Sequence, residues 1–298
     1  MKVLSLISTK GGAGKTTVAA NLGGLLADSG LRVLLLDLDS QPTLSSYYPL
    51  AVACNAGSYE LIAQKLTDPK QIVTATVIQR LDLIVSNDPG AHLNTQLLHA
   101  ADGRLRLRNL RSAFEDSYDV LIVDTQGARS VVVEMAILAS DCVLCPMPPE
   151  MLAARELRRG TLGMFEELEP YRFLGVPLPS VKLLLNQVNF NRRDTRLIMQ
   201  SLKTTFQADL HVSVCATVIP DRVAYLNAAT LGLPVHRVDT KPACSTRSQC
   251  AGEVMVSLAL ELFPEWRQKI TAVNSVSIPD AQSASLGKRT STQCSNRP

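Results

Sequence analysis

Short apolar runs recur along most of the chain and alternate with stretches of helical periodicity. The runs are residues 3–7, 32–37, 81–85, 120–123, 142–145, 181–185 and 212–219. Each is apolar on both faces, which is typical of a strand buried on both sides in a parallel sheet. Helical periodicity is clearest over residues 15–29, 152–168 and 194–206. This alternation predicts the α/β class, with a single doubly wound, mostly parallel β-sheet flanked by helices.

No internal repeat or interdomain linker interrupts the pattern. We therefore expect one domain over residues 1–268, whose last helix covers about residues 253–263 and packs in the core. From about residue 269 the chain becomes rich in Ser, Thr and Gln and poor in apolar residues. Such a composition buries too little apolar surface to fold, so residues 269–298 are expected to form a flexible polar tail.

Composition narrows the class of protein. With 46% hydrophobic and only 19% charged residues, the chain has enough apolar surface for a well-buried core. The net charge of +3 is mild, so DNA binding would require a local basic patch. The apolar start is too short for a signal peptide, and no run of about 18 apolar residues occurs. We expect a cytoplasmic protein.

Residues 10–17 read K-G-G-A-G-K-T-T between the first predicted strand and the first predicted helix. The common pattern G-x-x-x-x-G-K-[ST] fails because Thr9 occupies its first glycine position. The variant K-G-G-x-G-K-[ST] is present instead. Its glycines let backbone N–H groups turn towards phosphate oxygens, and the N-terminus of the following helix adds positive charge. The segment therefore predicts a phosphate-binding loop and slow hydrolysis of a nucleoside triphosphate.

Each residue type in this loop suggests a role. Lys15 is expected to contact the β- and γ-phosphates, Thr16 to give its hydroxyl to Mg²⁺, and Thr17 to lie near the α-phosphate. The remaining backbone of the cradle comes from Gly11, Gly12, Ala13 and Gly14. Lys10 has no obvious task, because the loop already contains its lysine. On the residues alone, Lys10 is either a solvated lysine or a second phosphate ligand.

The loop resembles the deviant Walker A motif of the ParA/MinD family of ATPases. That resemblance implies that Lys10 reaches across a nucleotide-sandwich dimer to the partner's phosphates, in the manner of an arginine finger. The segment L-D-L-D-S-Q-P at residues 36–42 is similar to the family's D-x-D-x-Q motif. By this resemblance Asp39 orients the attacking water and Asp37 supports the site near the metal.

Two later segments extend the resemblance over about residues 1–265. The strand Y-D-V-L-I-V-D at residues 118–124 is similar to a Walker B motif, which implies that Asp124 holds Mg²⁺ through water. Residues 218–222 and 231–235 are similar to the family's I-P-R-x-V and G-x-P-V segments. The family usually has T-P-P after the Walker B aspartate, whereas here Thr125-Gln126-Gly127 follows. We expect Gly127 to approach the γ-phosphate, with the hydrolysis rate open, or else to form a plain turn.

The base is expected to be adenine. Guanine-specific relatives carry N-K-x-D, but the corresponding strand end here reads N-Q-V-N at residues 186–189 and lacks the aspartate that would recognise guanine. We therefore expect Asn186 to contact the adenine edge and Pro220 to pack beside the ring. ATP and Mg²⁺ are the cofactors implied.

Two other groups of residues offer alternative chemistry. Cys142 and Cys145 could suggest a redox or metal site, but residues three apart on a strand face opposite ways, so buried structural cysteines are favoured. Arginines at 104, 106, 108 and 111 are each typical of a solvated helix face. By the family resemblance, nonspecific DNA would instead contact basic residues late in the chain. The candidates are Arg192, Arg193, Arg196, Lys203 and Arg222.

These observations favour a short ParA-type partition ATPase that is cytoplasmic and associated with the nucleoid. By the resemblance, ATP joins two protomers into a homodimer that binds nonspecific DNA, and a DNA-bound ParB-like partner stimulates hydrolysis. One alternative is a MinD-like ATPase that positions a complex at a membrane or pole. The C-terminal residues lack a basic amphipathic pattern, so membrane binding is not expected. The other alternative is a metabolic P-loop enzyme that uses ATP on a small substrate.

Overall fold

A computed structural model of the chain describes residues 1–150, 156–191, 193–206, 211–240 and 249–273. Within these residues, nine strands form one sheet in the order β3-β4-β5-β2-β6-β1-β7-β8-β9. The strands are β1 (Lys2–Leu6), β2 (Val33–Asp37), β3 (Leu50–Val52), β4 (Thr74–Thr76), β5 (Leu81–Ile84), β6 (Val120–Asp124), β7 (Cys142–Met147), β8 (Ser180–Val188) and β9 (Val212–Pro220). From β5 to β9 all neighbours are parallel. The predicted α/β fold with a mostly parallel sheet is confirmed.

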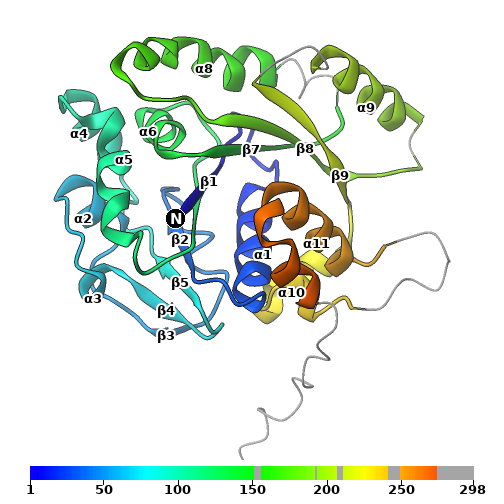
Figure 1. The fold of residues 1–298 in the computed structure, drawn as a ribbon, viewed down its shortest axis with the longest axis horizontal. Helices are drawn as coiled ribbons and strands as arrows, with labels where there is room; N and C mark the ends of the chain where they lie inside the picture. The colour runs from blue at the N-terminus through cyan, green and yellow to red at the C-terminus, as the bar shows by residue number, and fades with distance from the viewer. Residues whose placement is uncertain (151–155, 192, 207–210, 241–248, 274–298) are drawn as a thin grey trace, which may run out of the picture.

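Helices cover both faces of this sheet (Figure 1). One face carries α1 (Lys15–Asp28), α10 (Val223–Leu231), α11 (Ala251–Leu262) and α12 (Arg267–Ala272). The other face carries α2 (Ser58–Ala63), α3 (Pro69–Ile72), α4 (His92–His99), α5 (Arg106–Leu110), α6 (Val131–Ala139), α8 (Gly163–Leu168) and α9 (Arg193–Phe206). A π-helical turn over Leu157–Leu162 precedes α8. The predicted helix over residues 152–168 is therefore seen from residue 156, and residues 151–155 lie outside the described part.

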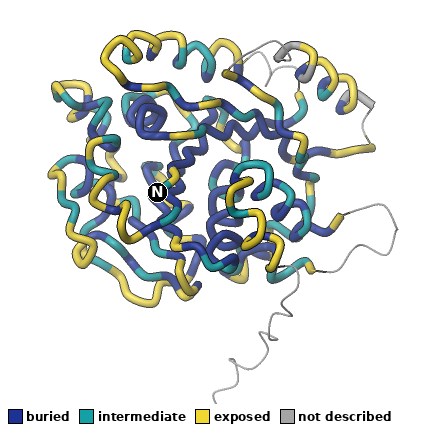
Figure 2. The backbone as a smooth tube through the Cα atoms, in the orientation of Figure 1, coloured by how far each residue is buried: buried dark blue, intermediate teal, exposed yellow. Residues whose placement is uncertain are grey.

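Side-chain alternation explains why the central strands are apolar throughout. In β2, Val33 and Leu35 pack with α1, whereas Leu34 and Leu36 pack on the opposite face. All four side chains are fully buried, and Figure 2 shows the central strands and α1 as the buried interior. A strand covered by helices on both faces has no polar face, so its sequence reads as a continuous apolar run.

The sheet differs from the prediction at one edge. Strands β3 and β4 have three residues each and pair antiparallel, and β4 pairs antiparallel with β5. All three residues of β3 are exposed. Strands of three residues carry no extended apolar run, and β4 reads T-A-T, so the apolar pattern did not predict them.

The C-terminal boundary also differs from the prediction. Helix α12 includes residues 269–272, which we expected to lie in the polar tail, because Ile270 is fully buried against the α1 side of the core. Residues 274–298, the remainder of that tail, lie outside the described residues.

Helix α1 is held in place by polar contacts at its middle and at its C-terminal end. Asn21, which is fully buried, accepts a hydrogen bond from the Val235 amide at 2.6 Å and donates to the Tyr47 hydroxyl at 3.0 Å. At the C-terminal end, Asp28 receives a two-point contact from the Arg237 guanidinium at 2.5 and 2.7 Å. His236 Nε2 lies 2.7 Å from the same carboxylate. These contacts fix the helix whose N-terminus begins at the glycine loop.

Asp28→Asn is expected to lower the melting temperature at neutral pH by about 4–8 °C, which corresponds to about 2 kcal/mol. Burial alone would raise the pKa of Asp28, but hydrogen bonds from His236 and Arg237 lower it below its ordinary value of 3.8. A depressed pKa contributes stability above the ordinary value and loses it as the pH falls through the folded one. In thermal melts, the melting temperatures of the wild-type protein and of Asp28→Asn should therefore become equal in strong acid. An undiminished difference there would contradict the charged contact.

Candidate nucleotide-binding site

The glycine loop lies between β1 and α1, at the carboxyl edge of the sheet. Gly12 and Gly14 adopt left-handed backbone conformations with φ of 73° and 86°, which glycine reaches without the steric cost of a side chain. A Cβ built on Gly11 or Gly12 would meet nothing within 4 Å. One side of the loop therefore faces open space, where a phosphate chain fits against backbone N–H groups and the N-terminus of α1.

Lys15 opens α1 beneath this space. It is only 7% exposed and forms no ion pair with any residue that the structure describes. Burial raises the pKa of Asp124 and the charge of Lys15 helps to lower it, but the two groups make no direct ion pair. Burying a charge is costly unless it is paired, and a bound phosphate would supply a direct partner, so the environment of Lys15 fits the expected ligand.

Carboxyl groups from two neighbouring strands meet beside the loop. Asp37 ends β2 and Asp124 ends β6, directly opposite one another in the sheet, and both are fully buried. Thr16 donates its hydroxyl to Asp124 Oδ2 at 2.6 Å, whereas Asp124 Oδ1 has no hydrogen-bond partner among the residues that the structure describes. Asp37 accepts hydrogen bonds from the Ser45 amide at 2.8 Å and the Ser45 hydroxyl at 2.7 Å. The predicted trio of Thr16, Asp37 and Asp124 is therefore brought together.

The electrostatics of this trio fit a bound cation. Burial raises the pKa of Asp37 to about 6 and that of Asp124 to about 7. A cation beside these groups would stabilise their charged forms. No group of three or more His, Cys, Asp or Glu among the described residues forms a metal site by itself. Mg²⁺ commonly binds through one or two protein oxygens together with phosphates and waters, so Thr16 and Asp124 suit Mg²⁺ that arrives with a nucleotide.

Asp39 follows β2 in a tight turn near the two buried carboxyl groups. Its Oδ1 accepts from the Gln41 amide at 3.0 Å, and its backbone carbonyl accepts from the Ser86 hydroxyl at 2.5 Å. The side chain is half-buried. Asp39 therefore combines a fixed backbone with a carboxylate oxygen that remains available, as a water-orienting group requires.

Gly127 packs directly against the glycine loop. A Cβ on Gly127 would lie 3.1 Å from the Cα of Gly11 and 3.4 Å from the Lys10 carbonyl oxygen. The preceding Thr125 donates its hydroxyl to the Leu6 carbonyl at 2.8 Å and is fully buried. The segment after β6 thus lies against the side of the loop where the terminal phosphate is expected.

Lys10 extends from the entry of the loop to an acidic partner. Its Nζ lies 2.8 Å from Glu150 Oε2, and the side chains are 33% and 52% exposed. Such half-exposed pairs contribute about 0–1 kcal/mol. Lys10 is therefore held within its own chain by a weak contact that a stronger anion could replace.

The end of β8 approaches the loop from the side of β7. Asn186 is buried and donates from Nδ2 to the Ala13 carbonyl at 2.8 Å, while Gln187 donates from Nε2 to the Gly12 carbonyl at 3.1 Å. We expected Asn186 to contact the base. Its amide nitrogen donates one hydrogen to the loop, which leaves Oδ1 and the second N–H for adenine. Pro220 ends β9 opposite Val188 and so lies at the same edge.

A family model described as an AAA domain matches residues 1–162 of this chain. Over 258 residues, 85% of this chain, the sequence is 30% identical to the chromosome-partitioning ATPase Soj of Thermus thermophilus and covers 94% of that protein. It is 28% identical over 267 residues to the sporulation initiation inhibitor protein Soj of Bacillus subtilis, with 88% of this chain and 98% of the relative covered. The chain belongs to the ParA/MinD family of P-loop ATPases.

Solved structures of this family share the fold. Apo McdA from Cyanothece superimposes with a TM-score of 0.70 at 22% identity, covering 92% of this chain and 98% of McdA. The septum site-determining protein MinD of Pyrococcus horikoshii, complexed with Mg-ADP, gives a TM-score of 0.65 at 18% identity, with 90% and 98% covered. At these identities the likeness concerns the fold alone.

The structure describes the side chains of only two of the five predicted DNA-contacting residues, Arg196 and Arg222. Arg196 is exposed on α9, and Arg222 lies 3.7 Å from Asp239 beside α10. Arg192 lies outside the described residues, as do the side chains of Arg193 and Lys203. A DNA surface built from these five residues therefore stays a prediction.

The arginines near residue 106 do not form the solvated helix face that we expected. Arg104 pairs with Glu134 at 2.6 Å, and Arg106 is buried and pairs with Asp102 at 2.5 Å. Arg111 donates to the Ala139 carbonyl at 2.8 Å. Arg111 thereby supplies a donor to the last carbonyl of α6, which has no partner within its own helix, and Arg104 ties the start of this segment to Glu134 of the same helix.

The cysteines form no metal site among the described residues. Cys142 packs on the α1 side of the sheet and Cys145 on the opposite side, as the strand period predicts. Burial raises the pKa of the Cys145 thiol above its ordinary value of 9.0, so it behaves as an apolar side chain.

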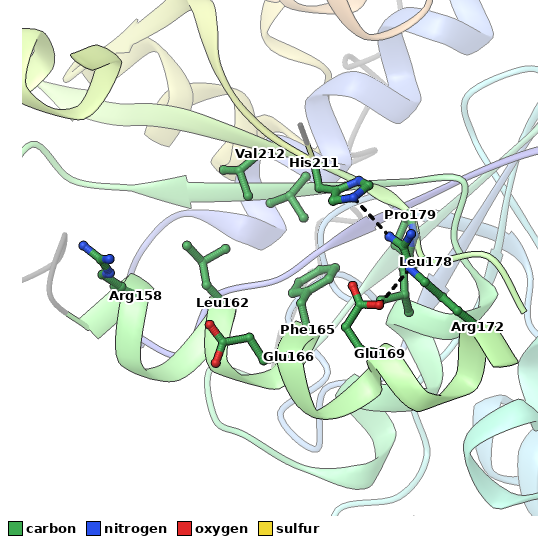
Figure 3. Close-up of a pocket in the computed structure, with 11 residues that line it drawn as sticks. Arg158, Leu162, Phe165, Glu166, Glu169, Arg172, Leu178, Pro179, His211 and Val212 are labelled. Carbon is green, nitrogen blue, oxygen red and sulfur yellow. Dashed lines mark hydrogen bonds and ion pairs between the residues drawn. The ribbon is translucent and has the colours of Figure 1, made fainter. Parts of the chain in front are cut away.

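A cavity of about 270 Å³ lies away from the nucleotide edge, at the beginnings of β8 and β9 (Figure 3). Leu162, Phe165 and Val212 form apolar walls, and Arg172 contacts Glu169 at 3.1 Å on its rim. None of the predicted nucleotide-binding residues lines it. No described helix is long and apolar enough to cross a membrane.

Sequence reasoning missed three residues of the nucleotide edge: Ser45, Glu150 and Gln187. The Ser45 side chain contacts Asp37, 8 positions away along the chain. Glu150 contacts Lys10, 140 positions away, and Gln187 contacts Gly12, 175 positions away. None stands in a motif that predicts such a contact. For Gln187 the one available signal was its place in the N-Q-V-N segment beside Asn186.

Proposed function

We propose that this chain is a DNA partition ATPase whose ATP-bound homodimer binds nonspecific DNA and is released when a ParB-like partner stimulates hydrolysis. The observation that carries the proposal is the position of Lys10. It lies at the open rim of the phosphate loop, and within the part of the chain that the structure describes its ammonium group pairs only with the half-exposed Glu150. The Thermus relative is a chromosome-partitioning ATPase, and its similarity over 85% of this chain supports the same proposal.

The cofactors are ATP and Mg²⁺, and each residue of the site has a task in hydrolysis. The loop N–H groups and Lys15 bind the phosphates, while Thr16 and Asp124 hold Mg²⁺, which neutralises charge on the phosphate oxygens when bound. Asp39 orients the attacking water. Asn186, through its free oxygen, and Pro220 lie at the base.

Lys10 completes the site from the second protomer. A cation that contacts the partner's phosphates makes the dimer interface depend on ATP, since ADP lacks the third phosphate that this cation would reach. Hydrolysis then removes the contact and weakens the dimer. Without the partner protein we propose that turnover is slow.

DNA binding follows from the charge of the dimer. The net charge of +3 per chain is small, so one protomer is attracted to DNA only weakly. A dimer brings two such protomers to the same DNA segment, which makes DNA binding depend on dimerisation. Exposed Arg196 and the neighbouring basic residues of α9, together with Arg222, are the proposed contacts.

A gel shift on nonspecific duplex DNA is expected to show retardation with ATP and none with ADP or without nucleotide. The affinity should fall steeply between about 50 and 200 mM salt, because phosphate contacts release counterions. Binding that ignores the nucleotide, or no binding, would contradict the partition function.

If DNA binding fails, two further measurements distinguish between the two alternative functions. ATP-dependent sedimentation with anionic liposomes would indicate a MinD-like positioning ATPase. Rapid turnover without DNA or partner protein would indicate a metabolic P-loop enzyme.

A further inference from the structure

The phosphate loop is contacted by two side-chain amides from one strand end. Asn186 Nδ2 donates to the Ala13 carbonyl at 2.8 Å and Gln187 Nε2 to the Gly12 carbonyl at 3.1 Å. The contact with Asn186 is close, since a Cβ on Gly14 would lie 2.2 Å from the amide nitrogen. Strand β8 pairs with β7 as far as Leu185, and with β9 at Leu185 and Val188 with an irregular register between those two residues. The two amides therefore come from a bulge that β9 holds at both of its ends.

Gln187 makes its contact from an unfavourable backbone conformation. Its φ is 57°, in the left-handed region where glycine is favoured and a side chain is rarely found. The residue is exposed and belongs to no hydrophobic cluster, so core packing does not account for a glutamine there. Its side-chain amide reaches Gly12, which is the one hydrogen bond that a glycine at position 187 would lose.

The loop has reason to need such a contact. Gly11 and Gly12 have no neighbour within 4 Å of a built Cβ, and glycine backbone has more conformational freedom than any other. Binding a phosphate chain requires the N–H groups of this segment to point in one direction. Any freedom that remains before binding is lost on binding and weakens it.

We propose that Gln187 is a positioning residue for the nucleotide, which holds the Gly11–Gly12 half of the phosphate loop in its binding conformation and so slows nucleotide release. The inference rests on the proposed binding of nucleotide at this loop, but not on dimerisation, DNA or a partner protein. Gln187 acts through the loop backbone and not on the base. Its loss therefore weakens adenine and guanine nucleotides by the same factor.

Gln187→Gly separates this role from a structural one. Glycine relieves the left-handed backbone and removes the amide, so the melting temperature is expected to stay constant or rise. The release rate of a fluorescent N-methylanthraniloyl ADP, chased with excess ATP in the full chain, is expected to rise about threefold to tenfold, as the loss of one neutral hydrogen bond implies. The dissociation constant should rise by the same factor, and kcat at saturating ATP should change little.

Gln187→Glu and Gln64→Ala complete the experiment. Glutamate keeps the length but places a carboxylate against the Gly12 carbonyl, so it should release the nucleotide at least as fast as Gln187→Gly. Gln64 is an exposed glutamine at the end of α2, away from the loop, and its alanine variant should release nucleotide at the wild-type rate.

Wild-type release by Gln187→Gly would overturn the proposal, as would a loss that differs between the ADP and GDP probes. These measurements contain no DNA, so failure of the partition function in the gel shift would leave their outcome unaffected. An absence of nucleotide binding in the wild-type protein would instead refute the proposed function itself.

Discussion

Lys10→Ala is expected to keep ATP binding within a few-fold of wild type while it abolishes the ATP-dependent dimer and lowers partner-stimulated hydrolysis by about 10³-fold. The first expectation follows from the geometry of the single chain, in which Lys10 points to Glu150 at 2.8 Å and Lys15 lies beneath the phosphate space. The second follows from the proposed transfer of Lys10 to the phosphates of the other protomer, where a cation stabilises charge that develops during hydrolysis.

Lys15→Ala supplies the contrast. Removing the buried lysine takes away a charge-assisted contact with the β- and γ-phosphates, so ATP affinity should fall about 10- to 100-fold. Equilibrium binding of a fluorescent ATP analogue measures the first step, and light scattering with a non-hydrolysable analogue measures the dimer. Equal losses of ATP binding in the two variants would remove the proposed role of Lys10 in the second protomer.

Glu150→Ala is the matched control for Lys10→Ala. It breaks the same 2.8 Å ion pair but leaves the lysine in place. If Lys10 acts on the partner's phosphates, the Glu150→Ala protein should still dimerise with ATP. It should need a lower ATP concentration than wild type, because Glu150 no longer competes with the phosphates for Lys10. A Glu150→Ala protein as inactive as Lys10→Ala would show that the pair within the chain was the important contact.

The parallel core and the site were predictable from sequence for one physical reason. Strands β2, β6 and β1 are neighbours in the sheet, and carboxyl ends of parallel strands meet at one edge. Asp37, Asp124 and the glycine loop each end or follow an apolar run, and the resemblance to the ParA/MinD family assigned the two carboxyl groups to the nucleotide site. Continuous apolar runs and a glycine-rich turn are strong signals because burial and φ restrict which residues fit.

The contacts that adjust the site could not be predicted in this way. Gln187 and Glu150 reach loop residues more than 100 positions away, and nothing local distinguishes them from solvated side chains. The same holds for Arg106, whose burial depends on how α5 lies against its neighbours. Asn186 shows the same limit: the sequence predicted a contact with the adenine edge, which stays a prediction, but not the hydrogen bond that its amide nitrogen donates to the Ala13 carbonyl.

Asp39→Ala is expected to lower kcat for ATP hydrolysis by about 10²- to 10³-fold while ATP binding is retained. Among the described residues the Asp39 side chain hydrogen-bonds only the Gln41 amide, so its removal is expected to leave the phosphate loop intact. Slower hydrolysis should also prolong the ATP-bound dimer and its DNA complex. Single-turnover assays with γ-labelled ATP measure the chemical step, and the gel shift with ATP measures the lifetime of the complex.

Asp39→Asn distinguishes the carboxylate from the turn that it stabilises. Asparagine keeps an oxygen that can accept from the Gln41 amide, so the turn after β2 should persist, but it lacks the negative charge that orients and polarises water. Both variants are therefore expected to be inactive in hydrolysis and competent in ATP binding. Wild-type hydrolysis by Asp39→Asn would assign Asp39 a role in the turn alone, and the neighbouring Asp37 or Asp124 would then be the candidate for orienting the attacking water, because both lie at adjacent strand ends.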